Sequence, residues 1–445
     1  MSPGSHVLAQ VRETKQLKLR EWFALRGPRY VGDRAVTLLS RYGITPSRAA
    51  ARVADCVAML AEHGCAPTFP TPGSVVQRHP RLIRRLQDAG AELAVHGYHH
   101  VDLGVSSPAE AARQLQRAAQ TFSRHGIEVY GFRCPYLRCG DSLFSALPKG
   151  LFSYSSNKAI WWDAVPAADV GKATAVFHAL QRFYQPVSAL DTVSTPLTRS
   201  HVVEIPVSLP DDLQLHDGLH LGPQEMAQVW GRILDESHRR GELFVLQFHP
   251  ELAWGDWHPF LMLLRQAKAL QPRVWVVRLR DIASWWREKA GFTVDVSYSP
   301  EGLHISFSCS ERATILVRGV DAGRGEPLWD GTYRRLEGRS LDVPAEPRPF
   351  VGLTAGAPGR LASFLREQGY ILDCGETASR CATYLDLATL ARLKSEVELT
   401  EHIEDSTAPL VRYWRWPDGA KSAMCITGDL DALSLVDYAF RLFVR

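Results

Sequence analysis

The regular alternation of helical and strand-like runs between residues 47 and 249 constrains the fold of this chain most strongly. Residues 46–64 carry apolar side chains at a spacing of about 3.6 residues and end at a glycine, which predicts a helix. Further helical runs separate short stretches rich in β-branched and aromatic residues, at 66–71, 92–97, 128–135, 202–209, 243–248 and 274–279. Repeated β-then-α units favour a parallel sheet or a barrel, so we predict an α/β fold.

The pattern changes after residue 288 and predicts a second structural unit. Short alternating runs, separated by Gly, Pro, Asp and Ser, indicate a small antiparallel β-sandwich. Mixed helical and strand-like runs then return, and a last strand precedes Gly428. We expect five segments: an N-terminal helical extension (1–46), a barrel (47–288), a β-rich sandwich-like domain (289–356), a mixed α/β bridge (357–420) and a C-terminal strand with a helix (421–445).

Composition argues against several classes of protein. Lys and Arg total 51 against 48 Asp and Glu, and a net charge of +3 gives no basis for a nucleic-acid groove. No stretch approaches the roughly 18 consecutive apolar residues of an integral membrane segment. The polar N-terminus lacks the apolar core of a signal peptide, so a cytoplasmic protein is expected. The eight dispersed cysteines are expected to be free, with Cys374 and Cys381 the one pair considered for a disulfide or metal site.

Several polar residues follow predicted strands, where barrels and parallel sheets place their sites. His96 and His100 are four residues apart, and imidazoles at that spacing can reach one metal ion, although such pairs also occur by chance or cap turns. His249 follows an apolar strand and is either a general acid or a satisfied polar residue at a strand end. Asp211 and Asp212 also lie near a strand end, and loop chemistry explains them equally well.

An arginine and two aspartates complete the candidates. Arg133 follows a strand within an Arg-Cys-Pro-Tyr segment, so its guanidinium either orients a carboxylate or lies at the surface. Asp429 and Asp431 follow the last strand of the chain. Two carboxylates at this spacing can divide the binding of a cation and the acceptance of a proton between them, or they can cap a turn or helix.

Together these residues resemble the signature of the NodB-like polysaccharide deacetylase family. In that family one strand ends in an Asp pair, a second in H-x-x-x-H, a third in R-x-P-Y and a late strand in L-x-x-H-P. The last three occur here, in family order, as His96/His100, Arg133–Tyr136 and Leu246–Pro250. Over about residues 47–288 the resemblance implies a distorted (β/α) barrel, a divalent metal, most often Zn²⁺, and removal of an acetyl group from an amino sugar or glycoconjugate precursor.

The Asp pair departs from the family pattern in its position. It should precede the helix that begins near Ser47, yet residues 38–46 contain no carboxylate and have a helical pattern. A strand with an Asp pair occurs instead at residues 422–431. We therefore predict a circular permutation in which the C-terminal strand fills the first position of the barrel, which is feasible because chain termini often lie close together.

The resemblance also implies which residues hold the metal. Asp431, His96 and His100 would be its ligands, and His99 is near enough in sequence to replace His100.

The same resemblance implies roles in catalysis. Asp429 would accept a proton from water while Arg133 fixes its orientation, and His249 would protonate the leaving amine. Tyr136, through its backbone N–H, and the neighbouring Pro135 would contact the substrate.

Three alternatives stay open at this point. The chain could be a catalytically inactive, deacetylase-like glycan-binding protein, in which the Asp pair belongs to a truncated second copy. It could be a homodimer in which each chain lends its last strand to the other. It could also be a metal-dependent amidohydrolase that acts on a non-sugar amide. Bound metal, mass in solution and a panel of acetamido substrates distinguish these alternatives.

Overall fold

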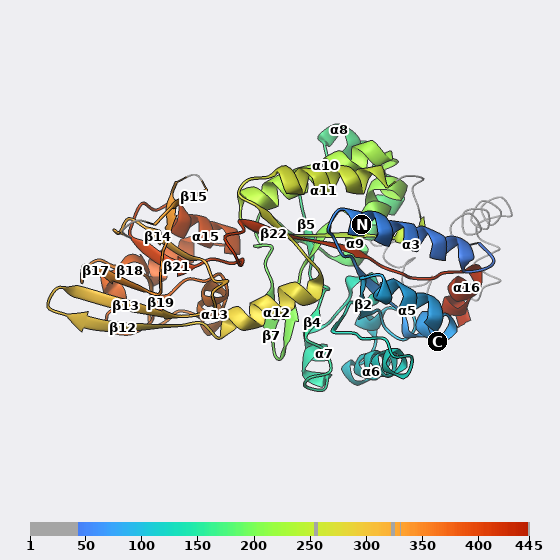
Figure 1. Ribbon diagram of the computed structural model, residues 1–445, viewed down its shortest axis with the longest axis horizontal. Coiled ribbons are helices and arrows are strands. Elements are labelled where there is room, and N and C mark those ends of the chain that lie inside the picture. The colour runs from blue at the N-terminus through green and yellow to red at the C-terminus, as the bar shows by residue number, and fades with distance from the viewer. Residues whose placement is uncertain (1–42, 253–256, 322–324, 330, 444–445) are drawn as a thin grey trace, which may run out of the picture.

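A twelve-stranded, mostly parallel sheet forms the larger part of the protein (Figure 1). The computed structural model describes residues 43–252, 257–321, 325–329 and 331–443. The predicted N-terminal extension, with the helical pattern that begins at residue 38, lies outside the described residues up to residue 42. The strand order is β6-β5-β9-β10-β22-β1-β2-β3-β4-β8-β7, and β11 also pairs with β22.

The sheet curls into a half-barrel, which confirms the predicted fold class of a distorted (β/α) barrel. Within the described residues its paired strands run parallel, apart from β7 and β8. The strands are β1 (Thr68–Thr71), β2 (Glu92–Val95), β3 (Gly131–Phe132), β4 (Tyr154–Ser155), β5 (Ala159–Trp161), β6 (Val187–Ser188), β7 (Leu197–Arg199), β8 (Val202–Glu204), β9 (Val207–Leu209), β10 (Leu243–Phe248), β11 (Val274–Val276) and β22 (Ser422–Gly428).

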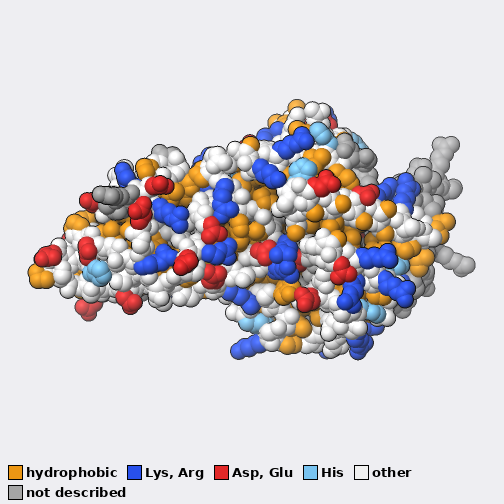
Figure 2. Space-filling view, in the orientation of Figure 1, with side chains coloured by type: hydrophobic (Ala, Val, Ile, Leu, Met, Phe, Trp, Pro, Cys, Tyr) orange, Lys and Arg blue, Asp and Glu red, His pale blue; other side chains and the backbone are white. Residues whose placement is uncertain are grey.

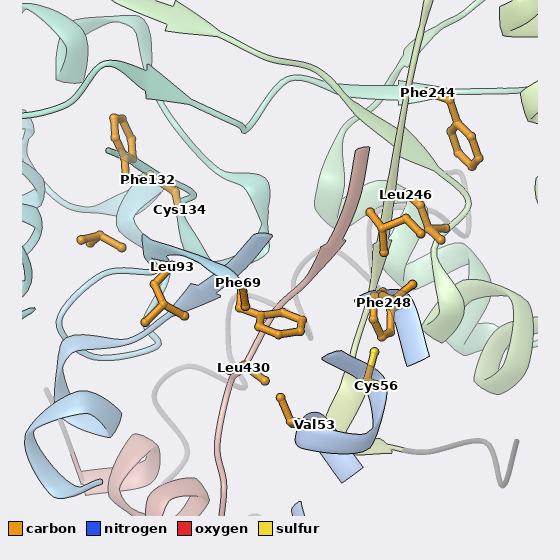
Figure 3. Packing of buried hydrophobic residues seen from close by; sticks show 14 of the residues in the cluster. Val53, Cys56, Phe69, Leu93, Phe132, Cys134, Phe244, Leu246, Phe248 and Leu430 are labelled. Atoms are coloured by element: carbon orange, nitrogen blue, oxygen red, sulfur yellow. The ribbon is translucent and has the colours of Figure 1, made fainter. Parts of the chain in front are cut away.

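Helices pack around this sheet and enclose a continuous apolar core. Figure 3 shows part of it, where Phe69 of β1 and Phe248 of β10 lie near Val53 and Cys56. Both of the latter lie on the buried face of α3, as the 3.6-residue spacing predicts. The helices of the barrel are α3 (Ser47–Glu62), α4 (Gly73–Arg78), α5 (Pro80–Asp88), α6 (Pro108–Arg124), α7 (Asp141–Ala146), α8 (Ala167–Val170), α9 (Ala175–Tyr184), α10 (Pro223–Arg239), α11 (His258–Ala269), α12 (Leu279–Ala290) and α16 (Leu435–Phe443).

The C-terminal strand β22 lies in the middle of the sheet, between β10 and β1. It runs parallel to β10 over six residue pairs, from Leu243 opposite Ala423 to Phe248 opposite Gly428. All seven of its residues are buried. Because β22 fills this position in the sheet of its own chain, exchange of the strand between two chains is not required to complete the barrel.

The sheet divides at residues 205–206. These residues lie inside the range 202–209, for which the sequence pattern predicts one strand. Pro206 has no backbone N–H to donate, and it lies between β8 and β9. Strand β8 pairs with β4, whereas β9 pairs with β5 and β10. The prediction of one strand is therefore wrong, and the two short strands belong to different arms of the sheet.

A smaller β-rich unit extends from the barrel on the left of Figure 1. Its strands share a buried core that includes Ile305, Val317 and Val411. Strands from both sides of residue 356 share sheets, since β18 pairs with β19 and β20, and β14 pairs with β21. These elements are β12 (Thr293–Ser299), β13 (Gly302–Ser308), β14 (Ile315–Arg318), β15 (Pro327–Leu328), β16 (Tyr333–Arg335), β17 (Ser340–Val343), β18 (Arg348–Leu353), α13 (Gly359–Glu367), β19 (Leu372–Asp373), β20 (Cys381–Leu385), α14 (Leu387–Arg392), α15 (Glu396–Glu404) and β21 (Leu410–Tyr413).

Two further sequence expectations concern the described residues as a whole. None of the helices in the described ranges combines the length and the apolar character of a membrane span. All eight cysteines are free thiols, so Cys374 and Cys381 do not form a disulfide.

Candidate functional site

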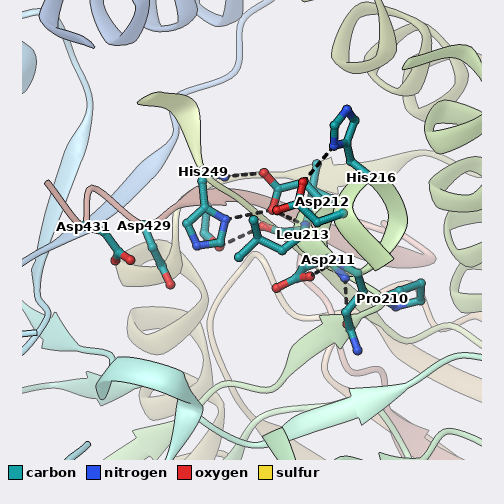
Figure 4. A network of polar contacts seen from close by, with 12 residues as sticks. Pro210, Asp211, Asp212, Leu213, His216, His249, Asp429 and Asp431 are labelled. Carbon is teal, nitrogen blue, oxygen red and sulfur yellow. Dashed lines mark hydrogen bonds and ion pairs between the residues drawn. The ribbon is translucent and has the colours of Figure 1, made fainter. Parts of the chain in front are cut away.

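The candidate side chains gather at one edge of the sheet because each follows the carboxyl end of a strand. His96 follows β2, Arg133 follows β3, His249 follows β10 and Asp429 follows β22. Main-chain hydrogen bonds continue from the strands into these residues: the N–H of Arg133 donates to Val95 O at 2.8 Å, and that of Asp429 to Phe248 O at 2.9 Å. Figure 4 shows His249 near the side chains of Asp429 and Asp431.

His96, His100 and Asp431 form a group with the composition of a metal site. Their donor atoms all lie within 4.8 Å of one another. Asp431 Oδ1 is 3.4 Å from His96 Nε2 and 3.2 Å from His100 Nε2. His96 Nδ1 lies 2.9 Å from the carbonyl oxygen of Arg133, which can only accept, so Nδ1 carries the proton and the lone pair of Nε2 faces the group. His99 is not a member of this group within the described residues.

Arg133 joins the ends of three strands through one fully buried guanidinium. Its Nη1 donates to Asp429 Oδ1 at 2.8 Å and to Thr427 Oγ1 at 3.0 Å. Nε and Nη2 donate to the carbonyl and the hydroxyl of Ser156, at 3.1 and 3.0 Å. Asp429 therefore has one oxygen fixed by Arg133, while its Oδ2 lies 3.8 Å from His96 Nε2.

His249 is held by Asp212, whose role the sequence did not indicate. Asp212 Oδ1 is 2.8 Å from His249 Nδ1, and Oδ2 accepts the backbone N–H of His249 at 2.8 Å (Figure 4). Burial alone lowers the pKa of His249, but the charge and hydrogen bond of Asp212, with Asp431 and Glu251 nearby, raise this pKa well above its ordinary value. The sequence feature that marks Asp212 is an Asp pair just after an apolar strand. Nothing in the sequence indicates that this pair contacts His249.

Asp211 supports the loop on which Asp212 lies. Its carboxylate accepts the N–H of Gln214 at 2.8 Å and the hydroxyl of Tyr184 at 2.9 Å. Burial, followed by the charge of Asp212, raises the pKa of Asp211 to about 7. Asp211 thus acts as a structural partner of the loop, behind the residues that face the site.

Tyr136 and Pro135 lie beside the histidines. The ring of Tyr136 meets that of His100 edge to face, with centroids 4.7 Å apart. Tyr136 has φ 63° and ψ 16°, a left-handed conformation that is uncommon for a residue with a side chain. Pro135 is buried and packs near Gly97, so this segment is fixed against the turn that carries the histidines.

The fold and this site define a class: an α/β protein with a curled, mostly parallel sheet whose carboxyl edge gathers histidine and carboxylate side chains around an arginine. Residues 42–149 match the family described as Polysaccharide deacetylase. This match supports, over residues 42–149, the resemblance to NodB-like polysaccharide deacetylases that the motifs indicate. The matched segment contains His96, His100 and Arg133, whereas His249 and the Asp pair lie outside it.

The chain is also similar to individual proteins. Peptidoglycan-N-acetylmuramic acid deacetylase PdaA of Bacillus subtilis (strain 168) is 28% identical over 95 residues, which are 21% of this chain and 32% of that protein. The chain therefore matches about a third of the length of this curated relative. A solved structure of the polysaccharide deacetylase type from Mycobacterium smegmatis is 22% identical, with a TM-score of 0.40, over 55% of this chain and 79% of that one. Another, from Pseudomonas aeruginosa PAO1, is 18% identical, with a TM-score of 0.39, over 53% and 72%.

Proposed function

We propose that this protein is a metal-dependent de-N-acetylase that hydrolyses the acetamido group of an amino sugar or glycoconjugate precursor. One observation supports this most strongly. Asp429 and Asp431, which are more than 300 residues away from His96 and His100 in sequence, lie against these histidines at the same sheet edge. This proximity supports our assignment of the Asp pair to the site that the family signature describes.

The donor set fits a divalent ion. Two imidazole nitrogens and one carboxylate oxygen form the ligand type of catalytic zinc sites, and the protonated Nδ1 of His96 leaves its Nε2 available for coordination. His96, His100 and Asp431 would hold the ion, for which Zn²⁺ is our first expectation. A bound Zn²⁺ would supply Lewis acidity toward a carbonyl oxygen.

Asp429 is placed to act as the general base. Arg133 occupies its Oδ1 and keeps the carboxylate in one orientation, so Oδ2 faces the group formed by His96, His100 and Asp431. A water molecule in that space would give its proton to Oδ2 as its oxygen attacks the acetamido carbon.

His249 is placed to act as the general acid. Against the effect of burial, the charge and hydrogen bond of Asp212 raise its pKa well above the usual range, which favours the protonated ring that a general acid needs. Asp212 binds Nδ1, which leaves the Nε2 proton for the sugar nitrogen when the carbon–nitrogen bond breaks. The backbone N–H of Tyr136 would donate to the developing oxyanion.

We also infer that the barrel is circularly permuted. Strand β22 lies parallel between β1 and β10, where the family order requires a strand ahead of α3. Leu435, just beyond β22, donates its N–H to Gly43 O at 3.0 Å, so the chain after β22 lies beside the chain that enters α3. The β-rich unit then connects the end of α12 to β22.

The test is acetate release by the Zn²⁺-loaded protein from N-acetylglucosamine, its oligomers and N-acetyl-lysine. We expect release from the sugars, and a loss of about a hundredfold or more in Asp429→Asn with metal content retained. Asp418→Asn, at an exposed position before β22, is the matched control and should keep full activity. Sugar binding without acetate release would instead favour the inactive glycan-binding alternative, and release from N-acetyl-lysine alone would favour the non-sugar amidohydrolase.

A further inference from the structure

A cavity of about 330 Å³ opens where the sheet divides into its two arms. Its lining comes from segments that follow β3 and β4 and from the end of β8, so it lies at the same sheet edge as the catalytic residues. Leu137 in its wall directly follows Tyr136, and Tyr184 in its wall donates its hydroxyl to Asp211. The cavity is therefore adjacent to the site, although the residues described so far do not fill it.

Asn157 lies in the wall of this cavity and ties it to the segment after β3. Its Oδ1 accepts the backbone N–H of Cys134 at 2.6 Å, and because that oxygen must be the acceptor, the other amide atom is the NH₂ group. This Nδ2 is buried and has no hydrogen-bond partner among the described residues. Asn157 as a whole is only 4% exposed.

Lys158 brings a positive charge to the wall of this cavity. Its ammonium forms no ion pair within 4.0 Å with a carboxylate of the described chain. Burial, more than any other effect, lowers the pKa of Lys158, while Glu396 and Glu204 partly offset this and Arg199 adds to it. An anion in the cavity would relieve the cost of burying this cation.

The carboxylates in the cavity wall form no ion pair with the Lys158 ammonium. Glu204 is buried and accepts three other donors, the Ser155 hydroxyl and the backbone N–H groups of Asn157 and Lys158. Asp141 is mostly exposed and pairs with Arg199 at the rim. What the cavity offers to an anion is thus the Lys158 ammonium, with the guanidinium groups of Arg138 and Arg199 in the same wall.

We propose that this cavity binds an anionic group carried by the substrate, a carboxylate or a phosphate, next to the acetamido sugar. The inference rests on the proposed deacetylase function and specifies its substrate class as negatively charged acetamido sugars. Asn157 has a structural role in this site, since its hydrogen bond to Cys134 fixes the cavity relative to the segment that ends in Tyr136.

The experiment compares three substrates that share one acetamido sugar. N-acetylglucosamine is neutral, N-acetylmuramic acid adds a carboxylate and N-acetylglucosamine 1-phosphate adds a phosphate. We expect the kcat/KM of the Zn²⁺-loaded protein to be at least about tenfold higher for one charged substrate than for the neutral one, mostly through KM. Which charged substrate is preferred identifies the anion.

Variants at Lys158 test whether the preference for a charged substrate arises in the cavity. Lys158→Met should remove it while leaving turnover of N-acetylglucosamine within about twofold, and Lys158→Arg should restore part of it. Lys149→Met, at an exposed lysine, is the control and should change nothing. Equal kcat/KM for all three substrates in the unaltered protein, or a preference that survives Lys158→Met, would overturn the inference.

Binding measurements separate this inference from the proposed function. Titration calorimetry with glucosamine 1-phosphate and with muramic acid, both of which lack the acetyl group, should show affinity that is lost in Lys158→Met. If these ligands bind in that way but no acetamido sugar is hydrolysed, the anion site stands and the proposed deacetylation fails. If sugars are hydrolysed and neither anion binds better than glucosamine, the deacetylation stands and the anion site is wrong.

Discussion

Arg133 shows how one buried residue determines the geometry of the site. A guanidinium without exposure to solvent is tolerated only when its donors are paired, and here they reach Asp429, Thr427 and Ser156. These partners lie on β22 or follow β22 and β4, so the cation holds strand ends that are far apart in sequence. The same contact that stabilises the barrel therefore orients the proposed base.

Arg133→Lys should impair both functions of this residue. An ammonium cannot reproduce the spread of donors of a guanidinium, so we expect kcat to fall by about tenfold or more and the free energy of unfolding to fall by about 1–3 kcal/mol. Steady-state acetate release and chemical denaturation measure the two effects. Arg113→Lys, at an exposed ion pair on α6, is the control. Unchanged kcat would show that Arg133 does not orient Asp429.

Asp431→Ala tests the proposed metal ligand. Removal of one of three protein ligands should weaken Zn²⁺ binding by about a hundredfold or more and abolish acetate release. Metal content by mass spectrometry after dialysis and calorimetric titration with Zn²⁺ would show the loss. If metal content equals that of the unaltered protein, Asp431 is not a ligand and the role given to the C-terminal strand is wrong.

Asp212→Asn separates the proposed acid from the metal site. The amide can still hold the backbone N–H of His249 but no longer supplies a negative charge to the ring, so we expect kcat to fall by about 10- to 100-fold. Metal content should stay unchanged, because Asp212 is not part of the group of His96, His100 and Asp431. Normal turnover in this variant would show that His249 is not the general acid.

At the scale of elements, the sequence predicted those features that depend on local pattern. The helix α3 and the strands β1, β2 and β10 follow from apolar spacing, and the site residues follow from their place at strand ends. The division between β8 and β9 was missed, because a single proline inside an apolar run gave a weak local signal. The pairing of Asp212 with His249 and the sheets shared across residue 356 depend on contacts distant in sequence, which pattern alone does not encode.

Helix α16 is attached to the barrel by Asp437, which allows a prediction about acid stability. Asp437 accepts hydrogen bonds from Leu433 N at 3.0 Å and from Arg78 Nε at 2.5 Å, and His79 lies 3.0 Å away. Burial raises the pKa of Asp437, but these partners, His79 and Arg78 foremost, outweigh it and lower the pKa to about 2. A lowered pKa means that the folded state prefers the charged carboxylate, so its stabilisation is present above about pH 4 and is lost as the pH falls toward 2.

Asp437→Asn should therefore destabilise the protein by about 2 kcal/mol near pH 6, and the difference from the unaltered protein should shrink toward pH 3. Chemical denaturation at several pH values measures this difference. Asp88→Asn, at an exposed position on α5, should show no such trend. A difference that is constant from pH 6 to pH 3 would mean that packing of the side chain, and not its charge, anchors α16.

At the scale of the whole molecule, the β-rich unit lies between two parts of the barrel in sequence and at one end of it in space (Figure 1). Buried hydrogen bonds hold it there: Trp416 Nε1 donates to Gly241 O at 2.9 Å, and Trp285 Nε1 to Arg415 O at 2.7 Å. Acidic and basic side chains are interspersed over the face in Figure 2, in keeping with the small net charge. The unit is thus a fixed extension, and the chain that leaves it enters the barrel as β22.

A rearranged chain tests whether β22 must enter the barrel directly from the β-rich unit. Because β22 is buried in the middle of the sheet, a chain that ends before Ser422 should not fold, and its failure would say nothing about permutation. We propose instead to open the chain between Asp418 and Gly419, at an exposed turn, and to join Arg445 to Met1 through a short Gly/Ser linker. Every strand of the barrel would then follow the order of the family.

If the barrel is permuted, this rearranged chain should fold, bind Zn²⁺ and release acetate within about threefold of the original, since all contacts of β22 with β1 and β10 can form again. Circular dichroism, metal content and kcat are the measurements, and the same rearranged chain with Asp431→Ala should fold but lose the metal. A rearranged chain that folds yet binds no metal would mean that the β-rich unit must feed β22 into the sheet for the Asp pair to reach His96 and His100. The order of the segments would then be part of the active structure, and the barrel would not be a simple permutation of the family fold.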